Sequence, residues 1–161
     1  VIQINLEDVP DAATNPFALL EFQRQIERQA FQLGGGNLVA PAQRMVDFVE
    51  NRVSRDLPEN SYKPGTRSVD LNEVLPDFVH QALRGALPIF GKKMKGYYTN
   101  EAILVGVESR TSSPIRIPRD KETLQHPQVK GLYPCAEGAG YAGGIVSAAI
   151  DGINCVDAIK I

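Results

Sequence analysis

A glycine-rich segment near the end of the chain, Gly131-Leu-Tyr-Pro-Cys-Ala136 followed by Glu137-Gly-Ala-Gly-Tyr-Ala-Gly-Gly144, gives the clearest indication of the architecture. Its first six residues are mostly apolar and its second part is a glycine turn. The run Ile145-Val-Ser-Ala-Ala-Ile150 comes next, with the small and apolar residues of a closely packed helix. This order predicts a strand, a turn and a helix, a layout that directs free backbone N–H groups at an anionic or polar ligand.

The turn formally satisfies the pattern G-x-G-x-x-G through Gly138, Gly140 and Gly143. A dinucleotide site also needs a second strand and an acidic residue about 20 positions further on. Only 18 residues follow Gly143, and the acidic ones fall in or just beyond the expected helix. We therefore do not expect a complete NAD site. Glu137 is placed to accept hydrogen bonds from ligand hydroxyls, and tight packing without a ligand is the alternative.

Upstream of this segment, the pattern predicts one strand and three helices. Residues 1–9 alternate between apolar and polar, as in a strand with one wet face. A helical stripe begins after the cap Asn15-Pro16, and Gly34-Gly35-Gly36 ends that helix. The triple glycine is alternatively a phosphate-binding loop. A second helix is expected to start at Pro41.

The third helix has the strongest periodicity, with apolar residues spaced from Leu75 to Phe90 and Pro88 expected to kink or end it. Three lysines follow it, where positive charge suits a helix C-terminus; a basic anion patch is the alternative. Residues 102–108 are apolar on both faces, which predicts a strand in the middle of a sheet. A shorter strand is expected through Ile115 and Ile117. The predicted fold class is α+β.

Composition narrows the possible partners. The 161 residues carry a net charge of −2, so charge does not support a nucleic-acid or anionic-membrane partner. No apolar run approaches the roughly 20 residues that span a bilayer. Two cysteines without a C-x-x-C pair fit a reducing, cytoplasmic setting, and no metal site is expected. Cys135 is read as an inert buried thiol rather than a redox group, and His80 as a solvated or satisfied side chain. A chain that opens on Val1 is expected to be a piece of something longer.

Two blocks, Gly106-Val-Glu-Ser-Arg110-Thr-Ser-Ser-Pro114-Ile-Arg-Ile-Pro-Arg-Asp120 and Gly131 to Ile145, resemble the C-terminal part of the uncharacterised FAD-dependent dehydrogenases. Those proteins are similar to the broader glutathione-reductase-like flavoproteins. Supporting blocks such as Ala30-Phe-Gln-Leu-Gly-Gly-Gly36 extend the resemblance over nearly the whole chain. One departure is Ala136, where the family usually has glycine, and the added methyl is expected to crowd a ligand slightly.

The resemblance implies a discontinuous FAD domain whose N-terminal Rossmann unit is absent from this chain. Residues 1–95 are then part of a helical substrate domain with an N-terminal strand, and residues 96–161 are the returning C-terminal segment of the FAD domain. The implied flavin-binding residues are Glu137, Gly138, Tyr141, Ala142, Gly143, Gly144 and Ile145. Arg110, Ser112 and Ser113 are implied to lie near the flavin or substrate; a surface ion pair with Glu108 is the alternative for Arg110.

Two hypotheses for function follow. In the first, the chain is a fragment of a FAD-dependent oxidoreductase that acts on a small-molecule substrate by hydride transfer. Its catalytic residues are unidentified, because the chain offers no obvious general base. The fragment alone is then expected to bind FAD poorly and to expose apolar surface that favours a homodimer. In the second, it is a non-catalytic binding or interaction domain in which the glycine turn serves only for packing.

Overall fold

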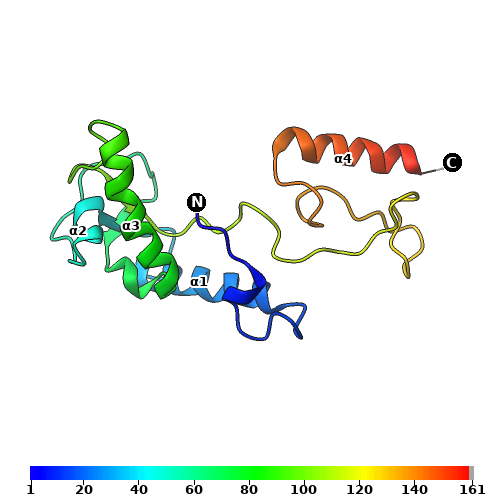
Figure 1. The fold of residues 1–161 in the computed structure, drawn as a ribbon, viewed down its shortest axis with the longest axis horizontal. Helices are drawn as coiled ribbons and strands as arrows, with labels where there is room; N and C mark the ends of the chain where they lie inside the picture. The colour runs from blue at the N-terminus through cyan, green and yellow to red at the C-terminus, as the bar shows by residue number, and fades with distance from the viewer. Residues whose placement is uncertain (160–161) are drawn as a thin grey trace. The chain divides into compact units, whose positions relative to one another are not determined.

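The computed structural model describes residues 1–159, which form two compact units. The first unit contains Val1–Asn5 and Phe22–Glu108, and the second contains Leu6–Glu21 with the segment from Ser109 onward. Within residues 1–159 there are four α-helices, two short 3-10 helices and three strands in one mixed sheet (Figure 1). The predicted α+β class is confirmed.

The sheet of the first unit is built around β1 (Ala40–Arg44), which lies between β2 (Thr66–Ser68) and β3 (Ile103–Val105). β1 runs parallel to β2 and antiparallel to β3, with Ala42 opposite both Ser68 and Val105. The predicted second helix exists only as Met45–Val49, and its predicted start at Pro41 is wrong, because Ala40–Arg44 is the central strand. Pro41 has no N–H to donate, but its carbonyl accepts from the Gly106 N–H at 2.8 Å.

The strand predicted at residues 102–108 exists, but it does not lie in the middle of the sheet as predicted. Residues 103–105 do form β3, but β3 is an edge strand and Val105 is 41% exposed. The apolar residues around it serve a different purpose, because Ala102, Leu104 and Val107 pack against the hydrophobic core. The apolar residues on both faces of residues 102–108 are therefore explained by packing against the helices, and not by a central position in the sheet.

Helix α1 (Ala18–Gly34) ends where the triple glycine was expected to stop it. Gly35 and Gly36 take positive φ values of 112° and 74°, and their N–H groups bond to the carbonyls of Gln32 and Phe31. These are the bonds that close a helix C-terminus with glycine. The short α2 (Met45–Val49) follows β1 directly, and its Phe48 is completely buried.

Helix α3 (Asp77–Lys93) continues through Pro88, so the expectation that Pro88 ends the helix is wrong. Proline inside a helix costs about 3 kcal/mol through the lost hydrogen bond and ring clash. Leu87, buried to 4% exposure beside it, belongs to the central cluster that offsets this cost. Lys92 and Lys93 occupy the last turn, where positive charge suits the helix dipole.

The core of the first unit is a cluster from the three helices and the loop before α3: Ala30, Met45, Phe48, Leu71, Val74 and Leu87. His80 is buried at its edge and packs edge-on against the Phe48 ring at 4.7 Å. Burial, with Arg84 nearby, lowers the pKa of His80, so the neutral form is favoured. His80 therefore acts as a packed core residue in this fold.

The second unit has little hydrophobic core. Its buried apolar side chains in the described part of the chain are Val9, Ala18, Pro134, Ala139 and Cys155. The long helix α4 (Ile145–Ala158) is present as predicted. Residues 1–9, all of them described, form no strand, and Leu6–Asp8 is instead a 3-10 helix. Residues 115–117, also described, form no strand either.

The division between the two compact units follows Glu108, and the boundary between residues 95 and 96 stays a prediction about substrate and flavin domains. The division falls there because β3 pairs with β1 and so holds residues 96–108 in the first unit. Whether the units correspond to substrate and flavin domains stays a prediction. None of the helices within residues 1–159 has the length and hydropathy needed to cross a membrane.

Candidate functional site

The glycine turn after Pro134 is a compact loop held by its own backbone. The Gly140 N–H donates to the Glu137 carbonyl at 2.9 Å, and the Tyr141 N–H donates to the Ala136 carbonyl at 3.0 Å. Ala136 and Gly140 both take positive φ values, 58° and 81°. Residues 131–136, all within the described part, form no strand, so the predicted strand–turn–helix is here a loop followed by a helix.

Gly140 lets the turn approach the neighbouring segment closely. A Cβ at Gly140 would lie 2.7 Å from the Ile115 carbonyl oxygen, which real Cβ atoms do not reach. Two further bonds join the segments: the Ile117 N–H donates to the Ala139 carbonyl, and the Tyr141 hydroxyl donates to the Ile117 carbonyl. Packing against residues 115–117 therefore explains one glycine of the motif without any ligand.

Helix α4 presents an open N-terminus directly after the turn. The Ser147 hydroxyl accepts from the Gly144 N–H at 3.2 Å and donates to the Gly144 carbonyl at 2.9 Å, and no side chain of residues 1–159 caps the N–H groups of the first turn. Ile145 and Val146 are 93% and 70% exposed. The first N–H groups of a helix have no partner inside it, and the helix dipole places about half a positive charge there. This end of α4 therefore suits an anionic or polar group.

The predicted site residues gather around this turn. Ser113 donates to the Ile115 carbonyl and to the Gly138 carbonyl, and a Cβ at Gly143 would lie 3.5 Å from the Ser112 Oγ. The two serines are thus brought to the turn, and Arg110 is an exposed residue of the same unit. Exposed positions of the turn are Glu137, Gly138, Gly143, Gly144 and Ile145; Tyr141 and Ala142 are half-buried. Their roles toward a flavin stay predictions.

An ion pair that sequence reasoning missed holds the turn to α4. Arg119 donates to both carboxylate oxygens of Asp151, at 2.7 and 2.9 Å, and also to the Pro134 carbonyl. Asp151 accepts a further bond from the Ala136 N–H at 2.8 Å. Hydrogen bonds from Arg119 and Ala136 lower the pKa of Asp151, and the bond to Asp151 raises the pKa of Arg119. Both side chains are mostly buried, with exposures of 11% and 15%.

The two cysteines meet beneath this ion pair. Cys155 is buried and accepts a hydrogen bond from Arg119 at 3.3 Å. Burial raises the pKa of Cys155, opposed by the positive charge of Arg119; Asp151 and a hydrogen bond with Cys135 act in the same direction as burial. Cys155 is therefore held as a protonated thiol. The prediction of a buried, inert Cys135 did not foresee this neighbour: Cys135 is half-buried and forms a hydrogen bond with Cys155.

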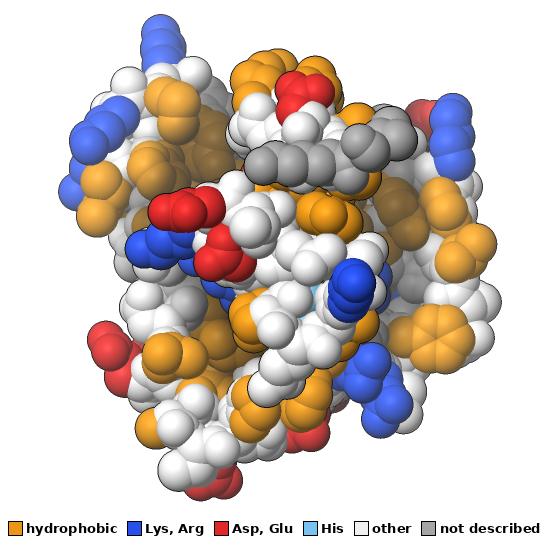
Figure 2. Space-filling view, turned by 90° about the vertical axis from the view of Figure 1, so that its right-hand side faces the viewer, with side chains coloured by type: hydrophobic (Ala, Val, Ile, Leu, Met, Phe, Trp, Pro, Cys, Tyr) orange, Lys and Arg blue, Asp and Glu red, His pale blue; other side chains and the backbone are white. Residues whose placement is uncertain are grey.

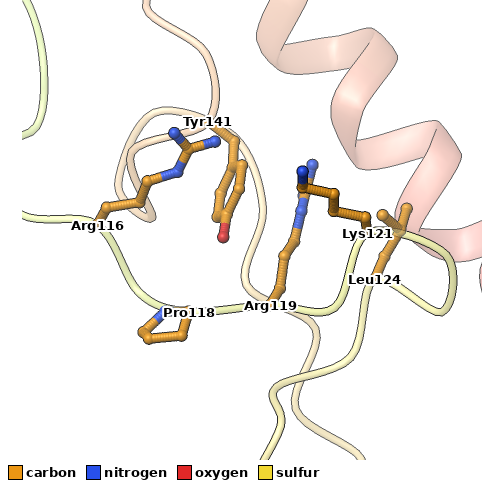
Figure 3. A pocket seen from close by; sticks show the side chains of 6 residues that line it. All are labelled: Arg116, Pro118, Arg119, Lys121, Leu124 and Tyr141. Carbon is orange, nitrogen blue, oxygen red and sulfur yellow. The ribbon is translucent and has the colours of Figure 1, made fainter.

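Tyr141 lies between two guanidinium groups (Figure 3). The central carbon of Arg116 is 4.3 Å from the centre of the Tyr141 ring, and that of Arg119 is 3.6 Å away. Both distances are typical of cation–π contacts. The ring lines a pocket together with Arg116, Pro118, Arg119, Lys121 and Leu124. Tyr141 is one of the predicted site residues, whereas Arg116 and Arg119 were not predicted; their spacing of three in a Pro-rich segment was the available clue.

Ala136 is strained by its left-handed backbone, and this yields a prediction. A left-handed conformation costs an L-residue about 1–2 kcal/mol, whereas glycine adopts it freely. Ala136→Gly is therefore expected to stabilise the second unit by about 0.5–1 kcal/mol, after the greater freedom of glycine in the unfolded chain is subtracted. Chemical denaturation would measure it. The control is Ala139→Gly, a buried alanine without positive φ, which should destabilise. An unchanged or lower midpoint for Ala136→Gly would contradict the strain.

Comparison with known proteins supports the resemblance. Residues 1–111 match the family model for the FAD-dependent protein, C-terminal domain-like family, and the chain belongs to that family. The chain is also 47% identical over 161 residues to an uncharacterized protein of Clostridium beijerinckii (strain ATCC 51743 / NCIMB 8052). That match covers 99% of this chain but only 30% of the relative. The family match ends before the glycine turn, so it does not reach the candidate site residues there.

Proposed function

We propose that this chain is the C-terminal part of a FAD-dependent oxidoreductase of the glutathione-reductase-like kind and forms the flavin-ring side of its FAD site. The observation that carries the proposal is the open N-terminus of α4 directly after the glycine turn, in a chain of a FAD-dependent family. Bound FAD would supply hydride transfer with a small-molecule substrate. The first unit would then contribute to the substrate domain.

The residues present fit this role. Glu137 is exposed at the turn, so its carboxylate is available to accept hydrogen bonds from ribityl hydroxyls. Gly143, Gly144 and Ile145 lie at the amide end of α4, and the glycines have no Cβ to hold a planar ring away. The partial positive charge of this helix end favours negative charge on the pyrimidine side of a reduced ring.

The surface of α4 also supports a larger protein. Ile145, Val146, Ile150, Ile153 and Val156 are between 53% and 93% exposed. Figure 2 shows hydrophobic side chains, in orange, exposed on the face of the molecule that is turned toward the viewer. Exposed apolar surface of this kind usually marks an interaction site. We infer that the rest of the flavin domain would pack against this side of α4, which we call the apolar face of α4.

FAD titration tests the proposal. The full-length protein is expected to bind FAD, and Glu137→Gln in it should weaken binding about tenfold, the effect of one lost charge-assisted hydrogen bond. Glu122→Gln, another exposed carboxylate of the same unit, is the matched control. The 161-residue chain alone should bind FAD poorly, because we place the pyrophosphate cradle outside it. Full-length protein that binds no FAD would overturn the function, and tight binding by the chain alone would overturn the position of the cradle.

Self-association of the isolated chain is a separate prediction. With the apolar face of α4 uncovered, the chain should form dimers through it, as apolar patches commonly do. Replacing Ile150 and Ile153 together with glutamate should shift the sedimentation coefficient to that of a monomer. Gln128→Glu together with Lys130→Gln changes the net charge by the same −2 at two exposed positions outside α4 and should leave the dimer intact. A chain that is monomeric before any substitution would contradict this prediction.

The alternative function is a non-catalytic binding or interaction domain. The contact of Gly140 with the Ile115 carbonyl favours it, since this glycine is needed for packing alone. The two functions differ at Gly138, where a Cβ would meet no atom within 4 Å. Only a ligand that approaches the turn closely would make Gly138 necessary.

A further inference from the structure

We propose that the pocket lined by Arg116, Lys121 and Tyr141 binds the oxyanionic group, carboxylate or phosphate, of a small organic ligand, with the Arg116 guanidinium as its main anchor. The pocket lies wholly in the second unit and measures about 470 Å³. That volume is within the range of small-molecule sites, roughly 300–1,000 Å³. The pocket shares Tyr141 with the residues implied to bind flavin, but no residue at the start of α4 lines it, so anion binding can be tested without flavin.

The charge of the pocket is unbalanced. Of its three basic residues, Arg119 is neutralised by its two bonds to Asp151. In the described part of the chain, neither Arg116 nor Lys121 forms an ion pair with a carboxylate, and both are exposed. The lining contains no acidic side chain. Two uncompensated positive charges beside one hollow favour an anion there.

Arg116 is also held in place before any ligand arrives. Its guanidinium stacks on Tyr141, whose hydroxyl is bonded to the Ile117 carbonyl and whose opposite side faces Arg119. This contact is of the cation–π kind, and the Arg116 guanidinium donates no hydrogen bond to another described residue, so its N–H groups are available to a bidentate oxyanion. A side chain that is already ordered loses less entropy on binding. A solvated surface arginine would lack this ordering.

The other lining residues indicate an organic ligand rather than a bare ion. Pro118 and Leu124 give the pocket apolar surface next to the charges. Leu124 is held at a φ of 55°, a left-handed conformation that is rare for a bulky side chain. Strained backbone of this kind tends to persist at ligand sites. The combination fits a small carboxylate or phosphate ester with a short apolar portion.

The test is binding to the 161-residue chain in the absence of flavin, by calorimetry, with inorganic phosphate, pyrophosphate and succinate as probes against potassium chloride of equal ionic strength. The double variant Arg116→Gln with Lys121→Gln should bind these anions at least about tenfold more weakly. The control is Arg28→Gln with Lys130→Gln, which removes the same charge from two exposed positions outside the pocket. Circular dichroism should show both variants folded.

Two outcomes would overturn the proposal: no anion binding beyond that of chloride, or equal binding by the pocket variant and the control. A further arm separates the possible sources of the oxyanion. If the pocket variant of the full-length protein loses FAD affinity, the oxyanion is the cofactor's own pyrophosphate. If the pocket variant leaves FAD affinity unchanged but weakens the binding of succinate or phosphate, the oxyanion belongs to a separate ligand. Failure of FAD binding altogether would remove the proposed function and leave the anion pocket standing.

Discussion

Replacing Asp151 with alanine is expected to unfold the second unit of the chain and leave the first unit folded. Asp151 takes two hydrogen bonds from Arg119 and one from the Ala136 N–H, so one carboxylate joins α4, the glycine turn and the segment around residue 119. Its loss leaves the mostly buried Arg119 without its partner. Removing one member of such a pair costs about 2–4 kcal/mol. With so few buried apolar side chains, this unit has little else to hold it together.

Amide hydrogen exchange would measure this effect separately for each unit. Protection should fall over residues 109–158 and persist over residues 22–108. The matched control is Asp157→Ala, which removes an exposed carboxylate from the same helix and should change protection little. Equal protection in the Asp151 variant and the wild type would show that the ion pair does not hold the unit together.

The same carboxylate predicts how the unit responds to acid. Hydrogen bonds from Arg119 and Ala136 lower the pKa of Asp151 below the value of about 3.9 expected in the unfolded chain. Its contribution is therefore fully present above that pH, and it is lost as pH falls from there through the folded-state pKa. The second unit should lose protection in this acid range. Asp151→Asn, which cannot titrate, should have a flatter acid dependence; an identical one would contradict the assignment.

Gly140→Ala is expected to have the second large effect. Its added Cβ would lie 2.7 Å from the Ile115 carbonyl oxygen, and backbone atoms on both sides cannot move away cheaply. The residue also takes a φ of 81°, which costs an L-residue about 1–2 kcal/mol. Together with the overlap, the expected loss is about 2–4 kcal/mol in the free energy of unfolding. Chemical denaturation followed by circular dichroism would measure it.

Gly138→Ala is the natural control, because it lies two residues away and a Cβ there meets no atom within 4 Å. Its stability should remain within about 0.5 kcal/mol of the wild type. A comparable loss at both positions would mean that the close packing at Gly140 is not the cause. In the full-length protein, weaker FAD binding by Gly138→Ala with unchanged stability would favour the flavin function over the packing alternative.

Local pattern was a good guide to helices and a poor one to the sheet. The triple glycine ended α1, and the apolar runs before Phe90 and after Gly144 formed α3 and α4. Each of these signals is contained within a few turns of chain. The strand β1 is different, because Ala40–Arg44 has no strand alternation and contains a proline. It is a strand because β2 and β3 bond to its two edges.

The candidate site divides in the same way. Spacing and residue type by themselves determined that a glycine turn precedes a helix whose amide end is open, since these depend on neighbours along the chain. Only the tertiary structure decided that Arg119 pairs with Asp151, 32 residues away, and that Arg116 stacks on Tyr141. Ion pairs and cation–π contacts have no sequence periodicity, because each charged or aromatic side chain could pair with many others in the chain. The tertiary fold determines which of these side chains come into contact, and the pocket forms only when they do.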